Sequence, residues 1–169
     1  EGVVLIFQEL SLVNELSVAE NIYLGSLPMK NGRVDWDTLY SNAQDVLNQL
    51  NCPASPKEPI SNLPIAQQQM IEIARGVALG AKVLILDEPT SSLTSKEKDS
   101  LFEIIKKLKS QGVGIVYISH KMDEIFEISD RIFVMRDGQT TGEFVTKDVD
   151  LDTIVQCMIG RTLHNYYYK

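Results

Sequence analysis

Two adjacent carboxylates, Asp87 and Glu88, follow a run of apolar residues at 83–86 and precede Pro89. A short apolar run that ends at a turn residue predicts a strand buried on both faces of a parallel sheet. Open α/β sheets bind their ligands at the carboxyl ends of such strands. One carboxylate there can hold Mg²⁺, which prefers oxygen ligands, while the other orients or deprotonates a water molecule. A strand that simply ends in a solvated acidic turn explains this short pattern equally well.

A histidine provides a second candidate group at a strand end. His120 directly follows another run that is typical of a buried strand, residues 113–119. An imidazole in this position can contact a terminal phosphate. A single histidine at a strand end is more often structural, but one acidic strand end and one histidine strand end in the same chain favour a functional site.

The elements that position these residues follow from hydrophobic spacing and turn residues. We expect strands at 3–7, 83–86 and 113–119, a hairpin with strands at 131–135 and 141–145, and helices beginning at 17 and covering 35–50, 64–78, 95–109, 121–128 and 151–159. Thr94 and Glu97 have the spacing of a capping box. Residues 28–33 are expected to form a loop, whereas Asp137-Gly138 indicates a hairpin turn. Strands that alternate with helices after residue 80 predict an α/β fold with a parallel sheet.

Composition and charge exclude several classes of protein. The chain has 169 residues, enough to bury a core, and a net charge of −7, whereas nucleic-acid binders usually carry a basic face. No apolar run approaches the roughly 20 residues that span a bilayer, and no signal peptide is visible. Cys52 and Cys157 are far apart, without metal-ligand spacing, and are expected to be free thiols.

Together these motifs resemble the ATP-binding cassette (ABC) ATPases, and in particular the first of two cassettes in bacterial sugar importers of the ribose and galactoside type. The resemblance extends from Gln8 to Arg161, nearly the whole chain. The strand that ends at Asp87 and Glu88 resembles Walker B, which implies that Asp87 binds Mg²⁺ and that Glu88 is the catalytic glutamate. Gln8 resembles the Q-loop glutamine, whose side-chain oxygen also reaches Mg²⁺. His120 resembles the switch histidine, a second catalytic group.

Two further segments resemble motifs that belong to nucleotide sites in this family. The D-loop corresponds to Ser91, Ser92 and Leu93, followed by Thr94 where an aspartate is common. The signature, Leu-Ser-Gly-Gly-Gln in most members, corresponds to Leu63, Pro64, Ile65, Ala66 and Gln67. Pro64 therefore replaces the serine whose hydroxyl reaches a γ-phosphate across a dimer interface, although a proline that merely begins a helix is the simpler interpretation. The amides at the start of that helix still offer hydrogen bonds to an anion.

The phosphate loop of the family, GxxxxGK[ST], does not occur in the sequence. In the family it precedes the Q-loop, and this chain opens abruptly on a buried-looking strand. We therefore expect a fragment that lacks Walker A and an N-terminal, β-rich part. The 169-residue chain alone is then expected to hydrolyse ATP negligibly, because neither the amide cradle nor the lysine of the loop is present.

The resemblance also implies an architecture, ligands and partners. It implies a P-loop NTPase-like parallel sheet with an inserted α-helical subdomain. The expected parts are a Q-loop strand and loop at 1–16, a helical subdomain at 17–80, an α/β core at 81–160 and a linker to a second cassette at 161–169. ATP and Mg²⁺ are the implied ligands, and monosaccharide import at the cytoplasmic side of the bacterial membrane is the implied function. The implied partners are a second cassette, fused or dimeric, transmembrane permease subunits and, indirectly, a periplasmic or extracellular sugar-binding protein, with no nucleic acid.

Two other functions stay open beside sugar import. A degenerate cassette that holds ATP only to join two subunits is compatible with Pro64 in the signature, whereas Glu88 and His120 favour a competent site. A chromosome-maintenance or repair ATPase has the same motifs. Its long coiled coil would lie between Gln8 and Leu63, a stretch that is short here and has no heptad pattern.

Overall fold

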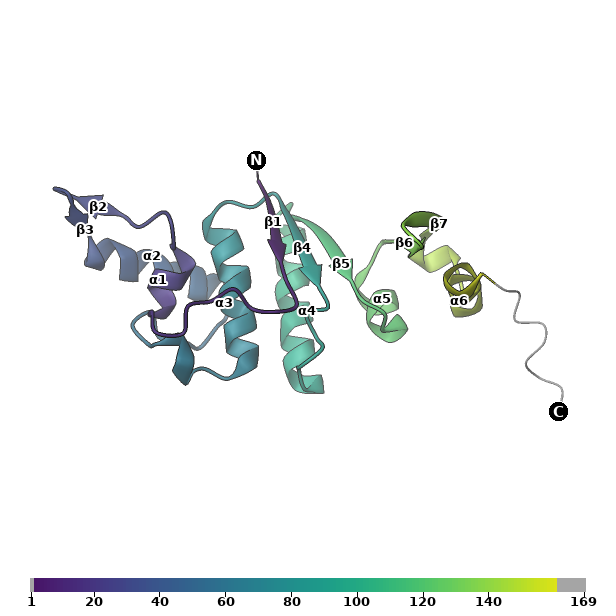
Figure 1. Cartoon of the computed structure of the whole chain (residues 1–169), viewed down its shortest axis with the longest axis horizontal. Helices are drawn as coiled ribbons and strands as arrows, with labels where there is room; N and C mark the ends of the chain where they lie inside the picture. Colours follow the sequence, from purple (N-terminus) through teal and green to yellow (C-terminus); the bar gives the residue numbers. More distant parts are fainter. Residues whose placement is uncertain (1, 161–169) are drawn as a thin grey trace. The chain divides into compact units, whose positions relative to one another are not determined.

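The computed structural model describes residues 2–160, which form two compact units, residues 2–118 and residues 119–160 (Figure 1). The expected linker, with Arg161 and the tyrosines at 166–168, lies outside the described residues. No helix among the described residues is long and apolar enough to cross a membrane.

A three-stranded parallel sheet organises the first unit. Its strands are β1 (Val3–Ile6), β4 (Val83–Asp87) and β5 (Gly114–Ile118), in the order β1-β4-β5 (Figure 1). Each strand is short and apolar, and the segments between them supply the crossovers that parallel neighbours require. The structure thus confirms the predicted α/β fold with a parallel sheet.

Two helices cover one face of this sheet, α3 (Ile65–Ala78) and α4 (Ser95–Ser110). Leu84 and Leu86 of β4 are buried on that face, and Phe102 of α4 packs edge-on against Tyr117 of β5, with ring centroids 6.0 Å apart. The capping box expected at Thr94 and Glu97 is present at the start of α4.

The opposite face of the sheet is exposed. The residues on this face alternate with the buried ones along each strand, and the large exposed ones are Val3, Leu5, Val116 and Ile118. On the same face, Ile85 of β4 is only half-buried. The prediction that β4 is buried on both faces is therefore wrong for the described structure, because both covering helices pack on the same side.

A helical layer lies between β1 and β4 in the sequence. It contains α1 (Val18–Ile22) and α2 (Trp36–Gln49), which both contact α3 (Figure 1), and a 3-10 turn at Ile60–Asn62. The expected loop at 28–33 is instead a small hairpin of β2 (Met29–Lys30) and β3 (Arg33–Val34). Asn31 and Gly32 both have positive φ, 51° and 76°, which is the type I′ geometry that favours a two-residue hairpin.

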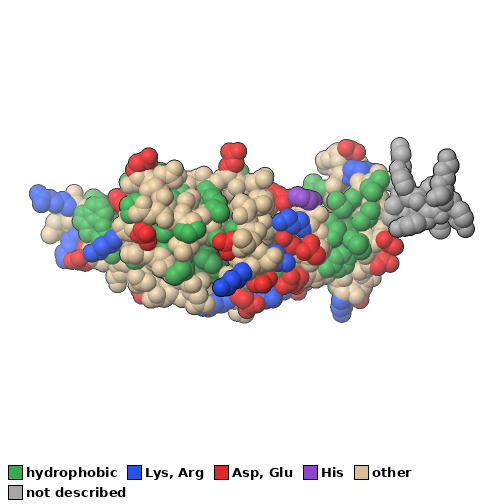
Figure 2. All heavy atoms as spheres, turned by 90° about the horizontal axis from the view of Figure 1, so that it is seen from below, with side chains coloured by type: hydrophobic (Ala, Val, Ile, Leu, Met, Phe, Trp, Pro, Cys, Tyr) green, Lys and Arg blue, Asp and Glu red, His purple; other side chains and the backbone are tan. Residues whose placement is uncertain are grey.

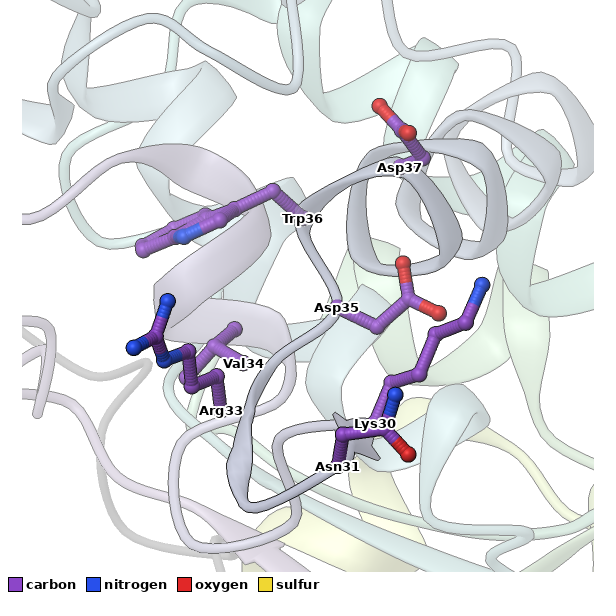
Figure 3. A pocket seen from close by; sticks show the side chains of 7 residues that line it. All are labelled: Lys30, Asn31, Arg33, Val34, Asp35, Trp36 and Asp37. Atoms are coloured by element: carbon purple, nitrogen blue, oxygen red, sulfur yellow. The ribbon is translucent and has the colours of Figure 1, made fainter.

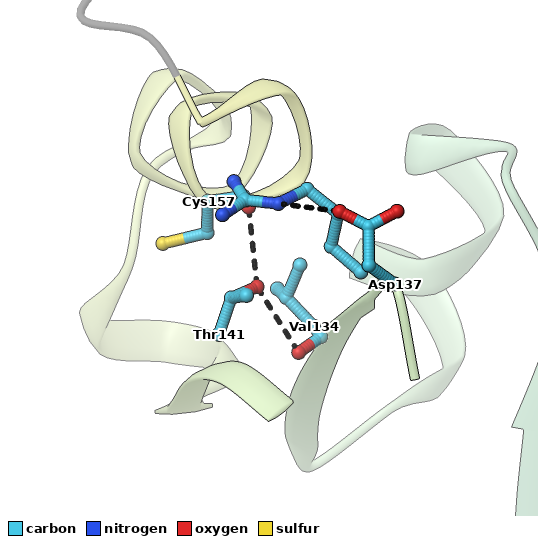
Figure 4. Close-up of polar contacts among 5 residues, drawn as sticks. Val134, Asp137, Thr141 and Cys157 are labelled. Atoms are coloured by element: carbon cyan, nitrogen blue, oxygen red, sulfur yellow. Dashed lines mark hydrogen bonds and ion pairs between the residues drawn. The ribbon is translucent and has the colours of Figure 1, made fainter. Parts of the chain in front are cut away.

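The second unit consists of two helices and a hairpin, as predicted. Its elements are α5 (Met122–Ile128), β6 (Arg131–Arg136), β7 (Gln139–Val145), a 3-10 turn at Thr146–Asp148 and α6 (Leu151–Ile159). Ile132, Val134 and Ile154 form its buried core. The Thr141 hydroxyl lies between the carbonyl oxygens of Val134, at 3.3 Å, and Cys157, at 3.1 Å, and so joins the hairpin to the end of α6 (Figure 4).

Candidate functional site

The strand register brings Gln8 and the two carboxylates to one edge of the sheet. Ile6, the last residue of β1, pairs with Leu86 of β4, and the chain then reaches Gln8 on one strand and Asp87 and Glu88 on the other. Parallel strands end at the same edge, so these side chains share the carboxyl edge where such sheets bind ligands. Gln8 is exposed, and both acids are partly buried.

Glu88 has an unusual backbone conformation. Its φ is +47°, in the left-handed region that residues other than glycine rarely adopt. Its amide donates a hydrogen bond of 3.0 Å to the carbonyl oxygen of Ile118, which lies at the end of the neighbouring strand β5. The chain therefore turns sharply after Asp87, and the hydrogen bond fixes the backbone from which the Glu88 side chain projects. Such strain is most often retained at functional sites.

The turn that follows Glu88 presents the expected D-loop residues. The Ser91 amide donates to the Glu88 carbonyl oxygen at 3.2 Å, and the Leu93 amide donates to that of Thr90 at the same distance. Thr90 is buried, whereas Ser91 and Ser92 are exposed and Leu93 is half-buried. These residues are thus available to a partner while the turn itself is anchored.

The segment that resembles the signature forms the start of α3. Leu63 and Ala66 are buried, Gln67 is half-buried, and Pro64 and Ile65 are exposed. Pro64 is the residue just before the helix, not within its first turn as expected, and no side chain caps the helix there. The Gln67 and Gln68 amides donate to the Pro64 carbonyl oxygen, at 2.9 and 3.1 Å, so the amides of Ile65 and Ala66 are the ones that this 14-residue helix offers to an anion, which a helix N-terminus attracts.

The segment that follows Gln8 is fastened by side chains that sequence reasoning missed. The carboxylate oxygen Oε1 of Glu72, in α3, accepts hydrogen bonds from the Ser11 amide at 2.6 Å and the Ser11 hydroxyl at 2.9 Å. Asn21 of α1 holds Val13: its side-chain Oδ1 accepts from the Val13 amide at 2.8 Å, and its Nδ2 donates to the Val13 carbonyl oxygen at 3.0 Å. A charged residue inside the apolar run of α3 was the only available signal for Glu72.

His120 belongs to the second unit and is exposed. It stands just before α5, where the Lys121 amide donates a hydrogen bond of 3.1 Å to the Ser119 hydroxyl. Lys121 also forms a 3.3 Å ion pair with the buried carboxylate of Glu124. The structure thus brings Gln8, Asp87 and Glu88 together in the first unit, whereas His120 lies in the other one.

The oxygen donors at the sheet edge fit a magnesium ion that is shared with a phosphate ligand. No group of three or more His, Cys, Asp or Glu side chains within residues 2–160 is arranged to hold a metal ion. Mg²⁺, however, is usually bound by only one or two protein groups, together with phosphate oxygens and water. The Asp87 carboxylate and the Gln8 amide oxygen, on adjacent strand ends, meet this requirement.

A surface hollow of about 710 Å³ lies elsewhere in the first unit, at the β2–β3 hairpin and the start of α2 (Figure 3). It is lined by Lys30, Asn31, Arg33, Val34, Asp35, Trp36 and Asp37. The backbone amide of Thr38 donates to Asp35 and lowers the pKa of that carboxyl. No residue singled out in the sequence lines this hollow, so the candidate site is the sheet edge, where the side chains able to do chemistry gather.

Sequence comparison relates nearly the whole chain to sugar-import proteins. It is 45% identical over 166 residues to the xylose import ATP-binding protein XylG of Moorella thermoacetica, a match that covers 98% of this chain and 33% of that protein. It is 48% identical over 168 residues to the galactose/methyl galactoside import ATP-binding protein MglA 1 of Photobacterium profundum, covering 98% and 34%. The chain thus spans about a third of the length of the curated relatives that it matches.

Solved structures relate the fold to ATP-binding cassettes of ABC transporters. The structure of cbiO1 from Clostridium perfringens, part of the ABC transporter complex cbiONQ, matches 91% of this chain and 61% of that chain with a TM-score of 0.76 at 24% identity. An ATP-binding cassette of an ABC transporter in its ADP conformation matches 95% of this chain and 69% of that chain, with a TM-score of 0.73 at 22% identity. Residues 1–91 also match the family described as ABC transporter. This match covers more than half of the chain, which therefore belongs to the ABC transporter family.

Proposed function

We propose that this chain is the part of an ATP-binding subunit that hydrolyses ATP to drive uptake of a monosaccharide. The observation that carries the proposal is the register of β1 and β4, by which Gln8 meets Asp87 and Glu88 at one sheet edge. Identities of 44–48% with xylose and galactose import ATP-binding proteins support the substrate class. The sequence has no GxxxxGK[ST] loop, so the longer subunit has to supply it.

Each residue of the site has a distinct role in this proposal. Asp87 and Gln8 hold Mg²⁺, which when bound neutralises charge on phosphate oxygens. Glu88 orients a water molecule for in-line attack on the phosphorus atom and accepts the proton of that water. The bond from its amide to the carbonyl oxygen of Ile118 fixes the backbone from which this carboxylate projects, which lowers the cost of positioning it during the reaction. His120 donates a hydrogen bond to the phosphoryl oxygens.

The exposed helix start and the exposed turn are the surfaces for a second cassette. Residues 63–67 and 91–93 would face the nucleotide site of that partner, where the helix amides would donate hydrogen bonds to its phosphate. The helical stretch 17–50 would face the membrane permease subunits, since it is inserted between nucleotide motifs yet carries no phosphate chemistry. A sugar-binding protein would act through the permease. The subunit would then work at the cytoplasmic side of the bacterial membrane.

Nucleic acid is not among the proposed partners. On the face shown in Figure 2, Lys and Arg side chains are interspersed with Asp and Glu and form no continuous basic area. The net charge of −7 supports the same view. The helices inserted after Gln8 are also short, since α1 has 5 residues and α2 has 14, unlike a long coiled coil.

A non-catalytic cassette that only joins subunits is the second candidate. The observation that favours it is Pro64 before α3, with no side-chain hydroxyl where the family has serine. The two candidates differ in what happens at Glu88. In the first, the site that contains Glu88 turns over ATP, and only the site completed by Pro64 is slowed. In the second, neither site turns over.

The test is ATP hydrolysis by the full-length subunit, with Asp87→Asn as the variant and Asp99→Asn, an exposed position in α4, as the matched control. We expect Mg²⁺-dependent phosphate release by the wild type and the control, and its loss in Asp87→Asn. Radiolabelled xylose and galactose uptake by cells that carry the same variants tests the substrate class. A wild-type subunit that binds ATP without releasing phosphate would favour the second candidate.

A further inference from the structure

Glu72 is a buried carboxylate that faces the segment after Gln8. Only 6% of the residue is exposed, and its neighbours Ile71 and Ile73 are almost fully buried. A buried carboxylate is costly unless hydrogen bonds compensate for its lost hydration. An apolar side chain would fill this position in α3 at lower cost, so packing alone does not account for the acid.

Within residues 2–160, the compensating bonds come from one residue. Oε1 of Glu72 accepts from the backbone amide of Ser11 at 2.6 Å and from its hydroxyl at 2.9 Å, and Nη1 of Arg75 lies 3.4 Å from the same hydroxyl. Bonds to a charged acceptor are stronger than neutral ones. The segment after Gln8 is thus attached to α3 by a two-point contact at Ser11.

This contact joins two parts of the nucleotide site. Ser11 is three residues after Gln8, and Glu72 stands one and a half turns after the signature segment 63–67 in the same helix. Segment 8–16 has no helix or strand of its own. Backbone amides hold its later part, from Ile60 to the Leu16 carbonyl oxygen at 3.1 Å and from Ser61 to that of Asn14 at 3.2 Å, so the earlier part depends on side-chain bonds. Asn21 fixes the other end of the segment through Val13, which leaves the stretch from Gln8 to Ser11 dependent on Glu72.

We propose that Glu72 is a positioning residue that ties the Gln8 segment to α3, so that a displacement of Gln8 by nucleotide is passed to the helix that begins at the signature. The inference rests on the proposed function and deepens it. Loss of the contact between Ser11 and Glu72 allows Gln8 to move without α3. ATP turnover is then no longer coupled to the signature segment 63–67, although Asp87 and Glu88 are unchanged.

Two substitutions at Glu72 separate hydrogen bonding from packing. Glu72→Gln keeps an acceptor oxygen of the same reach, and Glu72→Leu keeps the apolar bulk and removes the acceptor. Glu103→Leu on α4, whose side chain is 76% exposed, is the matched control for loss of an acid from a helix. Ser11→Ala, which removes the hydroxyl bond and keeps the amide bond, serves as a milder variant if Glu72→Leu does not fold.

The first measurement is the steady-state ATPase activity of the full-length subunit. Glu72→Leu should lower kcat for ATP about tenfold and change KM by less than threefold, because the contact between Ser11 and Glu72 acts on the turnover of bound ATP and not on ATP binding. Glu72→Gln and Glu103→Leu should stay within twofold of the wild type in both constants. Ser11→Ala should show a smaller fall in kcat, about threefold. A Glu72→Gln variant as impaired as Glu72→Leu would overturn the proposal.

The second measurement is amide hydrogen exchange of segments 9–16 and 63–67, with and without ATP and Mg²⁺. In the wild type both segments should change protection together, and in Glu72→Leu exchange in 9–16 should rise about tenfold while 63–67 ceases to respond. Equal responses in the two proteins would overturn the inference. A wild type that never hydrolyses ATP would refute the proposed function instead, and exchange in 9–16 without nucleotide would still report whether Glu72 holds Ser11.

Discussion

Gly76 of α3 and Leu84 of β4 approach so closely that a Cβ atom on Gly76 would stand 2.7 Å from Cδ2 of Leu84. The same atom would lie 3.5 Å from Val4 of β1. Leu84 is fully buried, so its side chain could withdraw only by displacing other atoms of a close-packed core. The absence of a side chain at one helical position therefore sets the distance between α3 and the sheet whose edge carries Asp87 and Glu88.

Gly76→Ala is expected to destabilise the protein by about 1–3 kcal/mol, the range for overpacking a core. This is the reverse of the effect of the same change in an exposed helix, where alanine is favoured by about 1 kcal/mol. Urea denaturation followed by circular dichroism gives the free energy of unfolding. Ser41→Ala, at an exposed position in α2, is the control and should be neutral or slightly stabilising. A stabilised Gly76→Ala protein would contradict the close approach.

Glu88→Gln in the full-length subunit is expected to leave ATP binding within about threefold of the wild type and to lower hydrolysis at its site at least 100-fold. The amide keeps the size of the side chain and its hydrogen bonding, but it cannot accept the proton of the attacking water. Fluorescent-nucleotide binding and phosphate release separate the two effects. Loss of binding would mean that Glu88 is a metal ligand and not the group that activates water.

Pro64→Ser combined with Ile65→Gly is expected to raise hydrolysis at the site that this signature completes. The restored serine hydroxyl can donate a hydrogen bond to a charged phosphate, which contributes about 1.5–3 kcal/mol. Glycine also lets the backbone approach more closely than the half-exposed Ile65 does. Phosphate release is measured with the Glu88 site silenced by Glu88→Gln. An unchanged rate in a correctly folded protein would assign Pro64 only the role of beginning a helix.

Low pH is expected to destabilise α4 through its capping box of Thr94 and Glu97. The pKa of Glu97 lies below its ordinary value of 4.5, because the hydroxyl of Thr94 and, to a smaller extent, its backbone amide donate hydrogen bonds to the carboxylate. Because the pKa is lower in the folded state, this stabilisation is present above pH 4.5 and is lost as the pH falls through the folded value. Thr94→Ala should lower the melting temperature by a few degrees at pH 7, with a smaller difference at pH 3. A constant difference across this range would exclude the contribution of Glu97.

The regular elements were predictable because each has a local pattern. Apolar runs and helical spacing located β1, β4, β5 and the helices within one or two residues, and glycine and proline marked several of their ends. The β2–β3 hairpin was missed because two-residue strands are too short to show alternation, although the dipeptide Asn31-Gly32 is itself a hairpin signal. The exposed sheet face was also not predictable, since an apolar strand does not reveal which of its faces the chain covers.

The site was predictable where it depends on strand ends and not where it depends on contacts between distant residues. Residue types and order singled out Gln8, Asp87 and Glu88, and the parallel register explains why they meet. The contact between Ser11 and Glu72 joins residues 61 positions apart, and no local pattern links them. The positive φ of Glu88 was not predictable from the sequence either, because nothing in a glutamate side chain favours that conformation.

The backbone of Glu88 has a consequence for protein engineering. Asparagine tolerates the left-handed conformation better than glutamate does, so Glu88→Asn is expected to recover part of the roughly 1–3 kcal/mol that such strain costs. The same change removes the carboxylate proposed to activate water. Selection for heat resistance alone would therefore favour inactive proteins at this position. Stability and turnover are opposed at a single residue, and a stabilised variant intended for assays has to keep Glu88 as it is.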